Sequence, residues 1–165
     1  MAVDWQARRS RTWRRPVMTI PTMTTPSQMP LVEAHYALGR RFFQEQDRLR
    51  GGPAETLCAP GYTATLGGNP AMDRAGHEGF ARGFYAGFPD VMHHIDEVVA
   101  TEDRIAVRFT LRGTHDGNFF GIPATHRPVT VRATVVMHVA NGKVSELFGI
   151  FDEAGLLRQI GVLPN

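Results

Sequence analysis

Polar and apolar residues alternate with a period of two along three stretches in the second half of the chain: residues 104–112, 129–140 and 144–151. This alternation predicts strands that bury one face and expose the other. Residues 113–123 have the composition of a loop, and Asn141-Gly142-Lys143 that of a tight turn. Consecutive strands joined in this way form an antiparallel sheet, and residues 152–161 are expected to follow it as a short helix.

Apolar residues in the first half recur instead every three to four positions, which is typical of amphipathic helices. One helix is predicted from Leu31 to about Arg50 and a later one from Arg74 to about Phe88, with Asp73 as N-cap of the later helix. The charged residues near the end of the first helix are expected mostly on its solvent face: Glu45, Asp47, Arg48 and Arg50. Shorter elements are also expected: a helix from Pro53 through Cys58 and strands at 62–66 and 92–100.

Helices gathered on one face of an antiparallel sheet define an α+β domain. The predicted domain has helices packed on a strongly curved sheet of four to five strands. Such a bent sheet leaves a cone with an apolar pocket at its open end, a common place for a small molecule. Phe80, Phe84 and Phe88 recur four residues apart in the later helix and are interpreted as core.

A chain of 165 residues, 42% of them hydrophobic, fits one domain. We assign that domain to residues 31–165, because residues 1–30 have the composition of a disordered basic arm. Five of the 18 Lys and Arg residues and one of the 16 Asp and Glu residues precede residue 31, so the domain carries 13 basic and 15 acidic residues. This balance argues against a nucleic-acid-binding domain.

Cys58 is the only cysteine, so no disulfide forms within the chain, and a cytoplasmic protein is expected. No run of about 18 apolar residues is present, so no membrane span is expected. The sequence contains no His-x-x-x-His or Cys-x-x-Cys pair and no glycine-rich nucleotide motif. We therefore expect neither a metal nor a cofactor.

Several motifs resemble those of the SnoaL-like polyketide cyclase family, over residues 31–163. They are Phe88-Pro89-Asp90, Gly113-Thr114-His115-Asp116-Gly117, Gly121-Ile122-Pro123-Ala124-Thr125, Asn141-Gly142-Lys143-Val144 and residues 152–161. The resemblance implies the nuclear transport factor 2-like fold, a cystatin-like cone, and an enzyme that closes rings by an intramolecular aldol step. In such cyclases an aspartate takes a proton from a carbon beside carbonyl groups, with a histidine nearby.

When the Gly142-Lys143 turn is aligned with the family, the family's aspartate corresponds to Gly149 and its histidine to Val135. Neither residue can transfer a proton, so the general base at this position is replaced. Asp152 lies three residues after Gly149, but it is predicted to be the N-cap of the last helix.

The geometry of the turn decides which side chains line the cavity. A three-residue loop with a glycine bulge pairs odd positions with odd positions, and we favour it because it keeps Val135 and Gly149 on one face. A two-residue Asn141-Gly142 turn would instead put Asp152 on the face of Val135. With the bulged loop Asp152 and His138 point outward, and the inward residues are Ala133, Val135, Met137, Val139, Leu147, Gly149 and Phe151.

Histidines are the remaining candidates for proton transfer near neutral pH. His93 is expected to point inward from its strand, and His115 to lie near the mouth of the cone; these two are the catalytic candidates. His77, early in the later helix, is interpreted as structural. The predicted substrate-binding residues are Tyr62, which would anchor a ligand oxygen, together with Val135, Met137, Leu147, Gly149 and Phe151.

Two functional classes follow. The first is a cofactor-free cyclase or isomerase-like enzyme that acts on a small, largely apolar carbonyl compound by proton transfer in the cone pocket. The alternative is a non-catalytic protein of the same fold that binds a small apolar molecule or serves in dimerisation. A homodimer is expected in either case, because the outward sheet face is apolar. That face is predicted to carry Val136, His138, Val144, Phe148 and Ile150.

Overall fold

The computed structural model describes residues 29–164. The predicted arm of residues 1–30 therefore lies outside the described residues, apart from Met29 and Pro30. These two residues begin helix α1 (Met29–Leu49), so this helix starts two residues earlier than predicted. A 3-10 turn, η2 (Glu55–Leu57), replaces the predicted short helix because the chain becomes extended at Cys58.

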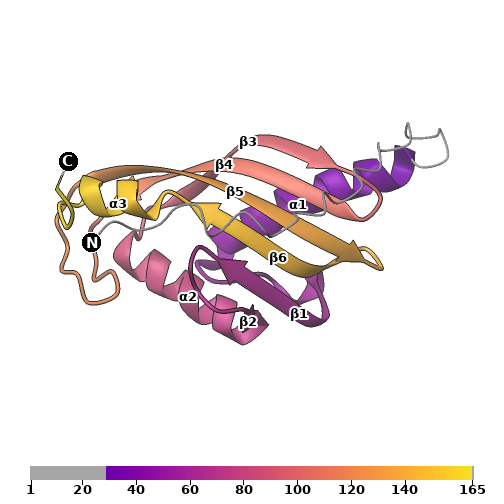
Figure 1. Ribbon diagram of the computed structural model, residues 1–165, viewed down its shortest axis with the longest axis horizontal. Helices are drawn as coiled ribbons and strands as arrows, with labels where there is room; N and C mark the ends of the chain where they lie inside the picture. The colour runs from indigo at the N-terminus through magenta and orange to yellow at the C-terminus, as the bar shows by residue number, and fades with distance from the viewer. Residues whose placement is uncertain (1–28, 165) are drawn as a thin grey trace, which may run out of the picture.

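Within residues 29–164, six strands form one curved sheet in the order β2-β1-β6-β5-β4-β3 (Figure 1). Their bounds are β1 (Cys58–Leu66), β2 (Met72–Asp73), β3 (Met92–Ala100), β4 (Arg104–Thr114), β5 (Pro128–Ala140) and β6 (Lys143–Phe151). The prediction of four to five antiparallel strands is wrong in two details. Strand β2 adds a sixth strand at one edge, and β1 pairs with β6 in parallel. A parallel pair needs a long crossover, so alternation within each strand does not reveal it.

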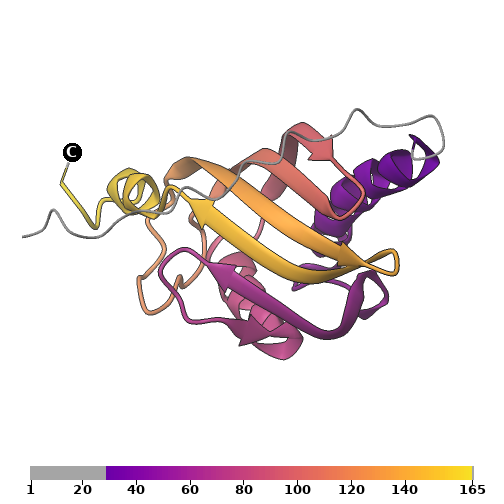
Figure 2. The ribbon, with the colours of Figure 1, turned by 45° about the vertical axis from the view of Figure 1, so that its right-hand side comes forward.

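Helices α1 and α2 (Arg74–Gly87) cover one face of the sheet, and α3 (Glu153–Gln159) follows β6 (Figures 1 and 2). Helix α1 packs against β3 and β4, whereas α2 packs against β1 and β2. Phe42 and Phe43 of α1 belong to one core cluster with Phe84 and Tyr85 of α2 and with inward side chains of the strands. The α+β class is thereby confirmed. Within residues 29–164, no helix combines the length and apolar character that a membrane crossing requires.

Both predicted helix caps are confirmed. The Oδ1 atom of Asp73 accepts a hydrogen bond from the Gly76 N–H at 2.8 Å, at the start of α2. The Oδ1 atom of Asp152 accepts one from the Gly155 N–H at 2.8 Å, at the start of α3. Asp152 is exposed, and its carboxylate stabilises a helix end rather than lining a cavity.

The β5–β6 hairpin combines the two turn geometries considered above. Asn141 and Gly142 form a two-residue turn with φ angles of 51° and 71°, the left-handed conformation that an Asn-Gly pair adopts readily. A register shift just beyond the turn restores the pairing of odd with odd positions, so Val135 lies opposite Gly149. The favoured face assignment is therefore correct, although the irregularity is in the strands and not in the turn.

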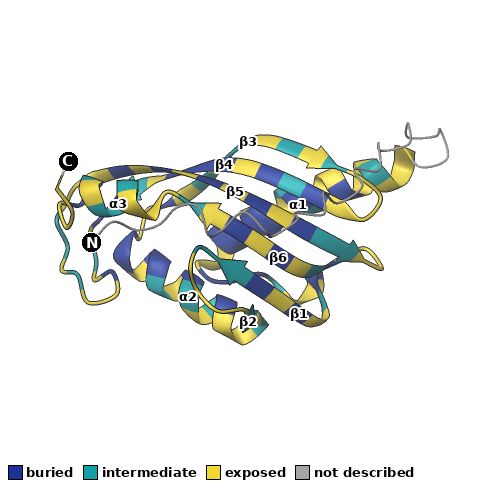
Figure 3. Cartoon of the chain, viewed as in Figure 1, coloured by how far each residue is buried: buried dark blue, intermediate teal, exposed yellow. Residues whose placement is uncertain are grey.

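The same shift corrects the outward face. Val144 pairs with Val139 before the register changes, and it is fully buried rather than exposed as predicted. Val136, Phe148 and Ile150 remain on the outward face and are 37%, 49% and 58% exposed. Figure 3 shows the resulting alternation of buried and exposed residues along β5 and β6.

Candidate functional site

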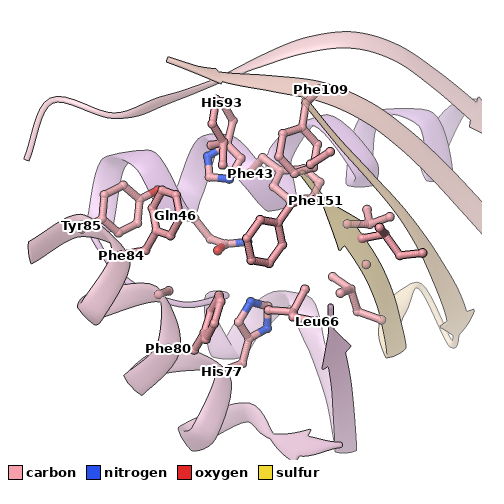
Figure 4. Close-up of a pocket in the computed structure, with 17 residues that line it drawn as sticks. Phe43, Gln46, Leu66, His77, Phe80, Phe84, Tyr85, His93, Phe109 and Phe151 are labelled. Carbon is pink, nitrogen blue, oxygen red and sulfur yellow. The ribbon is translucent and has the colours of Figure 1, made fainter. Parts of the chain in front are cut away.

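A pocket lies between the inward face of the sheet and helices α1 and α2 (Figure 4). The cavity measures about 80 Å³, and the whole hollow with its opening to solvent measures about 630 Å³. Much of the wall is aromatic: Phe43, Phe80, Phe84, Phe109 and Phe151. Besides Tyr85, three polar side chains of residues 29–164 interrupt the wall: Gln46, His77 and His93. An apolar wall with few polar groups is typical of small-molecule sites.

His93 of β3 is held by Asp47 of α1. The Nδ1 atom of His93 lies 2.7 Å from Asp47 Oδ1, and the His93 backbone N–H donates to Asp47 Oδ2 at 3.0 Å. The Tyr85 hydroxyl donates to Asp47 Oδ1 at 2.9 Å. Asp47 is buried behind these partners, whereas the His93 imidazole reaches the pocket. The rings of Phe43 and Phe109 flank it, with centroids 5.0 and 4.9 Å away.

The surroundings of Asp47 fix the tautomer of His93. Burial raises the pKa of Asp47, but hydrogen bonds and charge from His93 and the hydroxyl of Tyr85 together outweigh burial, so the pKa lies below its usual value. The carboxylate is therefore ionised at neutral pH and only accepts hydrogen bonds. Nδ1 of His93 must carry the hydrogen, which leaves the lone pair of the neutral imidazole on Nε2. Among residues 29–164, Nε2 has no hydrogen-bond partner, so it is available to a molecule in the pocket.

Gln46 of α1 presents an unpaired amide to the same pocket. The residue is 4% exposed, and its Nε2 atom is buried without a hydrogen-bond partner in the described part of the chain. Leaving a buried polar group unpaired costs about 1–3 kcal/mol, so such groups need an explanation. In the view of Figure 4 the amide lies among the aromatic side chains, between His93 and His77.

His77 of α2 is paired with Tyr62 of β1. The Tyr62 hydroxyl oxygen lies 2.8 Å from His77 Nδ1, and both residues are buried. Burial lowers the pKa of His77 to about 4 and raises the pKa of Tyr62. Both side chains are therefore neutral at physiological pH. His77 lines the pocket, and Tyr62 lies behind it.

The family model of the SnoaL-like polyketide cyclase matches residues 39–160, well over half of the chain. The chain belongs to the SnoaL-like polyketide cyclase family. Membership of this family supports a cyclase or isomerase-like role. No curated protein matches the sequence.

Solved structures agree with membership of the SnoaL-like family. AclR, "a putative hydroxylase" from Streptomyces galilaeus, has a TM-score of 0.72 and 25% sequence identity, over 82% of this chain and 85% of AclR. IdmH, "a putative polyketide cyclase" from Streptomyces antibioticus, has a TM-score of 0.61 and 27% identity, over 81% of this chain and 98% of IdmH. A "putative SnoaL-like polyketide cyclase" from Jannaschia sp. CCS1 has a TM-score of 0.68 and 22% identity, over 85% of this chain and 97% of that one, which shows the shared fold.

Within this SnoaL-like domain, the pocket collects most of the predicted substrate-binding residues. Those that line it are Val135, Leu147, Gly149 and Phe151. Met137 is fully buried and does not line the pocket, and Tyr62 reaches it only through its bond to His77. His77, interpreted from the sequence as structural, is part of the pocket wall.

The two catalytic candidates are not brought together. His93 lines the pocket, but His115 does not. His115 is fully buried, with its ring centroid 5.0 Å from that of Phe88 and its Nδ1 atom 3.0 Å from Thr125 Oγ1. Because His115 stands at the start of a loop between two strands, it was expected to lie near the mouth of the cone. The loop instead folds back onto the end of α2, where the Gly117 N–H donates to the Gly87 carbonyl at 3.0 Å.

Asp47 and Gln46 were missed by sequence reasoning. Asp47 was expected on the solvent face of the first helix, and that expectation is wrong, because it is only 8% exposed. The spacing of residues in the first helix could have indicated that Gln46 and Asp47 are buried. Gln46 and Asp47 follow Phe42 and Phe43 by four residues and so continue the buried stripe of α1. Two polar residues in a buried stripe indicate a site.

Proposed function

We propose that this SnoaL-like domain is an enzyme that moves a proton on a small, largely apolar carbonyl compound, without a cofactor, in a cyclisation or an isomerisation. The observation that carries the proposal is the Asp47–His93 pair, whose imidazole faces an aromatic pocket. A histidine oriented by a buried carboxylate is a general base with a defined tautomer. The polyketide cyclases in the family support the same reaction class.

In the proposed reaction, Nε2 of His93 removes a proton from a carbon beside a carbonyl group. The C–H bond breaks, its electron pair forms an enolate, and the imidazole becomes an imidazolium that Asp47 stabilises. In an isomerisation the imidazolium returns the proton to another carbon of the enolate system. In a cyclisation the enolate carbon bonds to a second carbonyl carbon, and the proton goes to the alkoxide oxygen formed there. Either route leaves the protein unchanged.

This base comes from a different part of the cone than the family's aspartate. Gly149 and Val135, which align with the family's two active positions, lie opposite each other in the pocket wall and hold no transferable proton. His93 reaches the same pocket from β3. We infer that the proton is transferred in this protein by His93 of β3, held by Asp47 of α1, and not by a residue at the position of Gly149 on β6.

The test is the exchange of α-hydrogens for deuterium in small aryl ketones, beginning with 1-tetralone, followed by NMR in D2O. Wild-type protein is expected to accelerate exchange over buffer, and His93→Gln is expected to lower the acceleration by about 10²- to 10⁴-fold. His126→Gln is the matched control, because it removes the histidine of an exposed His–Asp pair with an Nδ1 to Oδ1 distance of 2.9 Å.

Two results would overturn the enzymatic proposal. One is a His93→Gln protein that retains the wild-type rate. The other is a wild-type protein that binds these ketones but accelerates exchange in none of them. The second result would favour the alternative function, a non-catalytic binder of small apolar molecules, for which the aromatic wall is equally suited.

A further inference from the structure

Proton transfer by His93 leaves two polar groups of the pocket without a role. Gln46 and His77 lie on α1 and α2, and both line the pocket that His93 enters. The Gln46 Nε2 atom is buried and unpaired in the described part of the chain, so its N–H donors are free for a ligand. A buried donor without a partner destabilises the ligand-free protein, and a ligand oxygen that accepts its hydrogen bond would remove this free-energy cost.

His77 can supply a second donor. The Tyr62 hydroxyl has no acceptor among residues 29–164 other than Nδ1 of His77, 2.8 Å away, so it donates its hydrogen to that atom. A neutral imidazole that accepts at Nδ1 carries its hydrogen on Nε2. The low pKa of His77, about 4 because of burial, keeps the ring neutral, and a neutral imidazole is an effective hydrogen-bond donor to a developing oxyanion.

We propose that the Gln46 amide and the His77 Nε2–H form an oxyanion site that binds the oxygen of a planar aromatic ligand, either a phenolate or an enolate. This inference rests on the proposed function, because it supplies the oxygen-binding partner that an enolate-forming base requires. Gln46 and His77 are then catalytic residues, and Tyr62 is a positioning residue that sets the tautomer of His77.

The pocket wall defines the class of ligand. Among residues 29–164, the pocket lining includes no Lys, Arg, Asp or Glu, so a carboxylate or phosphate would find no ionic partner in this part of the chain. A delocalised oxyanion suits neutral donors better, because its charge is spread over the ring. The rings of Phe43, Phe84 and Phe109, together with the small volume of the cavity, favour a flat aromatic body.

The test compares two probes of similar shape: 4-nitrophenolate, and 4-nitroanisole, which has no anionic oxygen. Binding is measured at a pH at which the phenol is ionised. Wild-type protein is expected to bind the phenolate at least about tenfold more tightly than the anisole. Gln46→Met should weaken phenolate binding about tenfold and change anisole binding less than about twofold. Gln44→Met, at an exposed position on the same helix, is the matched control and should change neither.

Tyr62→Phe provides a milder second variant, because it keeps the ring and removes only the hydroxyl that orients His77. It should weaken phenolate binding about two- to fivefold and leave anisole binding unchanged. Equal weakening of both probes by Gln46→Met would show that Gln46 only packs, and would overturn the oxyanion site. So would a wild-type protein without preference for the phenolate.

His93→Gln separates this inference from the proposed function. If that variant stops deuterium exchange but keeps its preference for the phenolate, both proposals stand. If Gln46→Met keeps the phenolate preference while His93→Gln stops exchange, the oxyanion site is wrong and the base is right. If His93→Gln exchanges normally while Gln46→Met loses the preference, the site binds oxyanions but His93 is not the base.

Discussion

The Nδ1 atom of His93 lies 2.7 Å from the Oδ1 atom of Asp47, a residue 46 positions earlier in the chain. The pair joins the pocket wall on edge strand β3 to the buried stripe of α1. The Tyr85 hydroxyl holds the same carboxylate oxygen from α2, so three elements fix the orientation of one imidazole. Positioning of this kind is what a general base requires, because the proton it takes must lie within hydrogen-bond reach.

The stability of the protein should fall in weak acid because of His77. Burial lowers the pKa of His77 to about 4, whereas its ordinary value is 6.5. Above pH 6.5 the histidine is neutral in both states, and its contribution to stability is fully present. Between pH 6.5 and 4 the unfolded chain binds a proton that the folded state does not. The free energy of unfolding should therefore fall by about 3 kcal/mol over this window.

Urea unfolding across this pH range measures the effect in wild type and in His77→Gln. The variant should show a shallower fall than wild type, and the remaining slope should include His115, whose pKa is also lowered by burial. His94→Gln removes an exposed histidine from strand β3 and serves as the control for loss of an imidazole at the surface. An equally steep fall in His77→Gln would contradict the assignment.

Phe148 offers a test of the expected homodimer. It is 49% exposed on the outward face of β6, beside Val136 and Ile150, and this face is apolar enough to attract a second copy. Phe148→Arg should convert dimers to monomers in light scattering, because a buried guanidinium would lack a partner. Tyr36→Arg, at a 45% exposed aromatic position on α1, which covers the opposite face of the sheet, should leave the oligomer intact. A wild-type monomer, or an unchanged dimer in Phe148→Arg, would refute this interface.

Gly149 has little room for a side chain, although its backbone is ordinary extended strand. A Cβ atom there would lie 2.8 Å from Leu66 Cδ2 and 2.9 Å from Val135 Cγ1. Gly149→Ala should therefore lower the free energy of unfolding by about 1–3 kcal/mol. Gly79→Ala is the contrasting control. Apart from its chain neighbours and the backbone of its own helix, no atom of residues 29–164 lies within 4 Å of a Cβ at that position, so stability should rise by about 0.5–1 kcal/mol. If Gly149→Ala left the free energy of unfolding unchanged, the side chains of Leu66 and Val135 would be able to shift at little cost, contrary to this prediction.

Features encoded within a few residues could be predicted from the sequence. The caps at Asp73 and Asp152 depend on a side chain and a backbone N–H three residues later, and both are present. The strands of the hairpin were predicted from alternation. The shared face of Val135 and Gly149 was taken from the family resemblance and used to choose the bulged loop, and the observed pairing of the two residues agrees with it. Each of these depends on local backbone geometry or on one hairpin.

Features that depend on contacts between distant segments could not be predicted. The parallel β1–β6 pair joins strands from opposite ends of the domain. The sequence placed His115 near the mouth of the cone, but its loop packs on the end of α2 and buries the histidine. Asp47 was expected to be exposed to solvent, because charged residues near a helix end usually are. Its partner His93 comes from another element, and only the fold brings the two together.

The most direct measurement is the α-hydrogen exchange rate of an aryl ketone in wild type, His93→Gln, Asp47→Asn and the double variant. If His93 is the base and Asp47 fixes its tautomer, each single variant should lower the rate by about 10²-fold or more. The double variant should then be no more than about twofold slower than His93→Gln, because the two residues act as a unit. Effects that multiply in the double variant, or a His93→Gln protein with the wild-type rate, would contradict proton transfer by this pair.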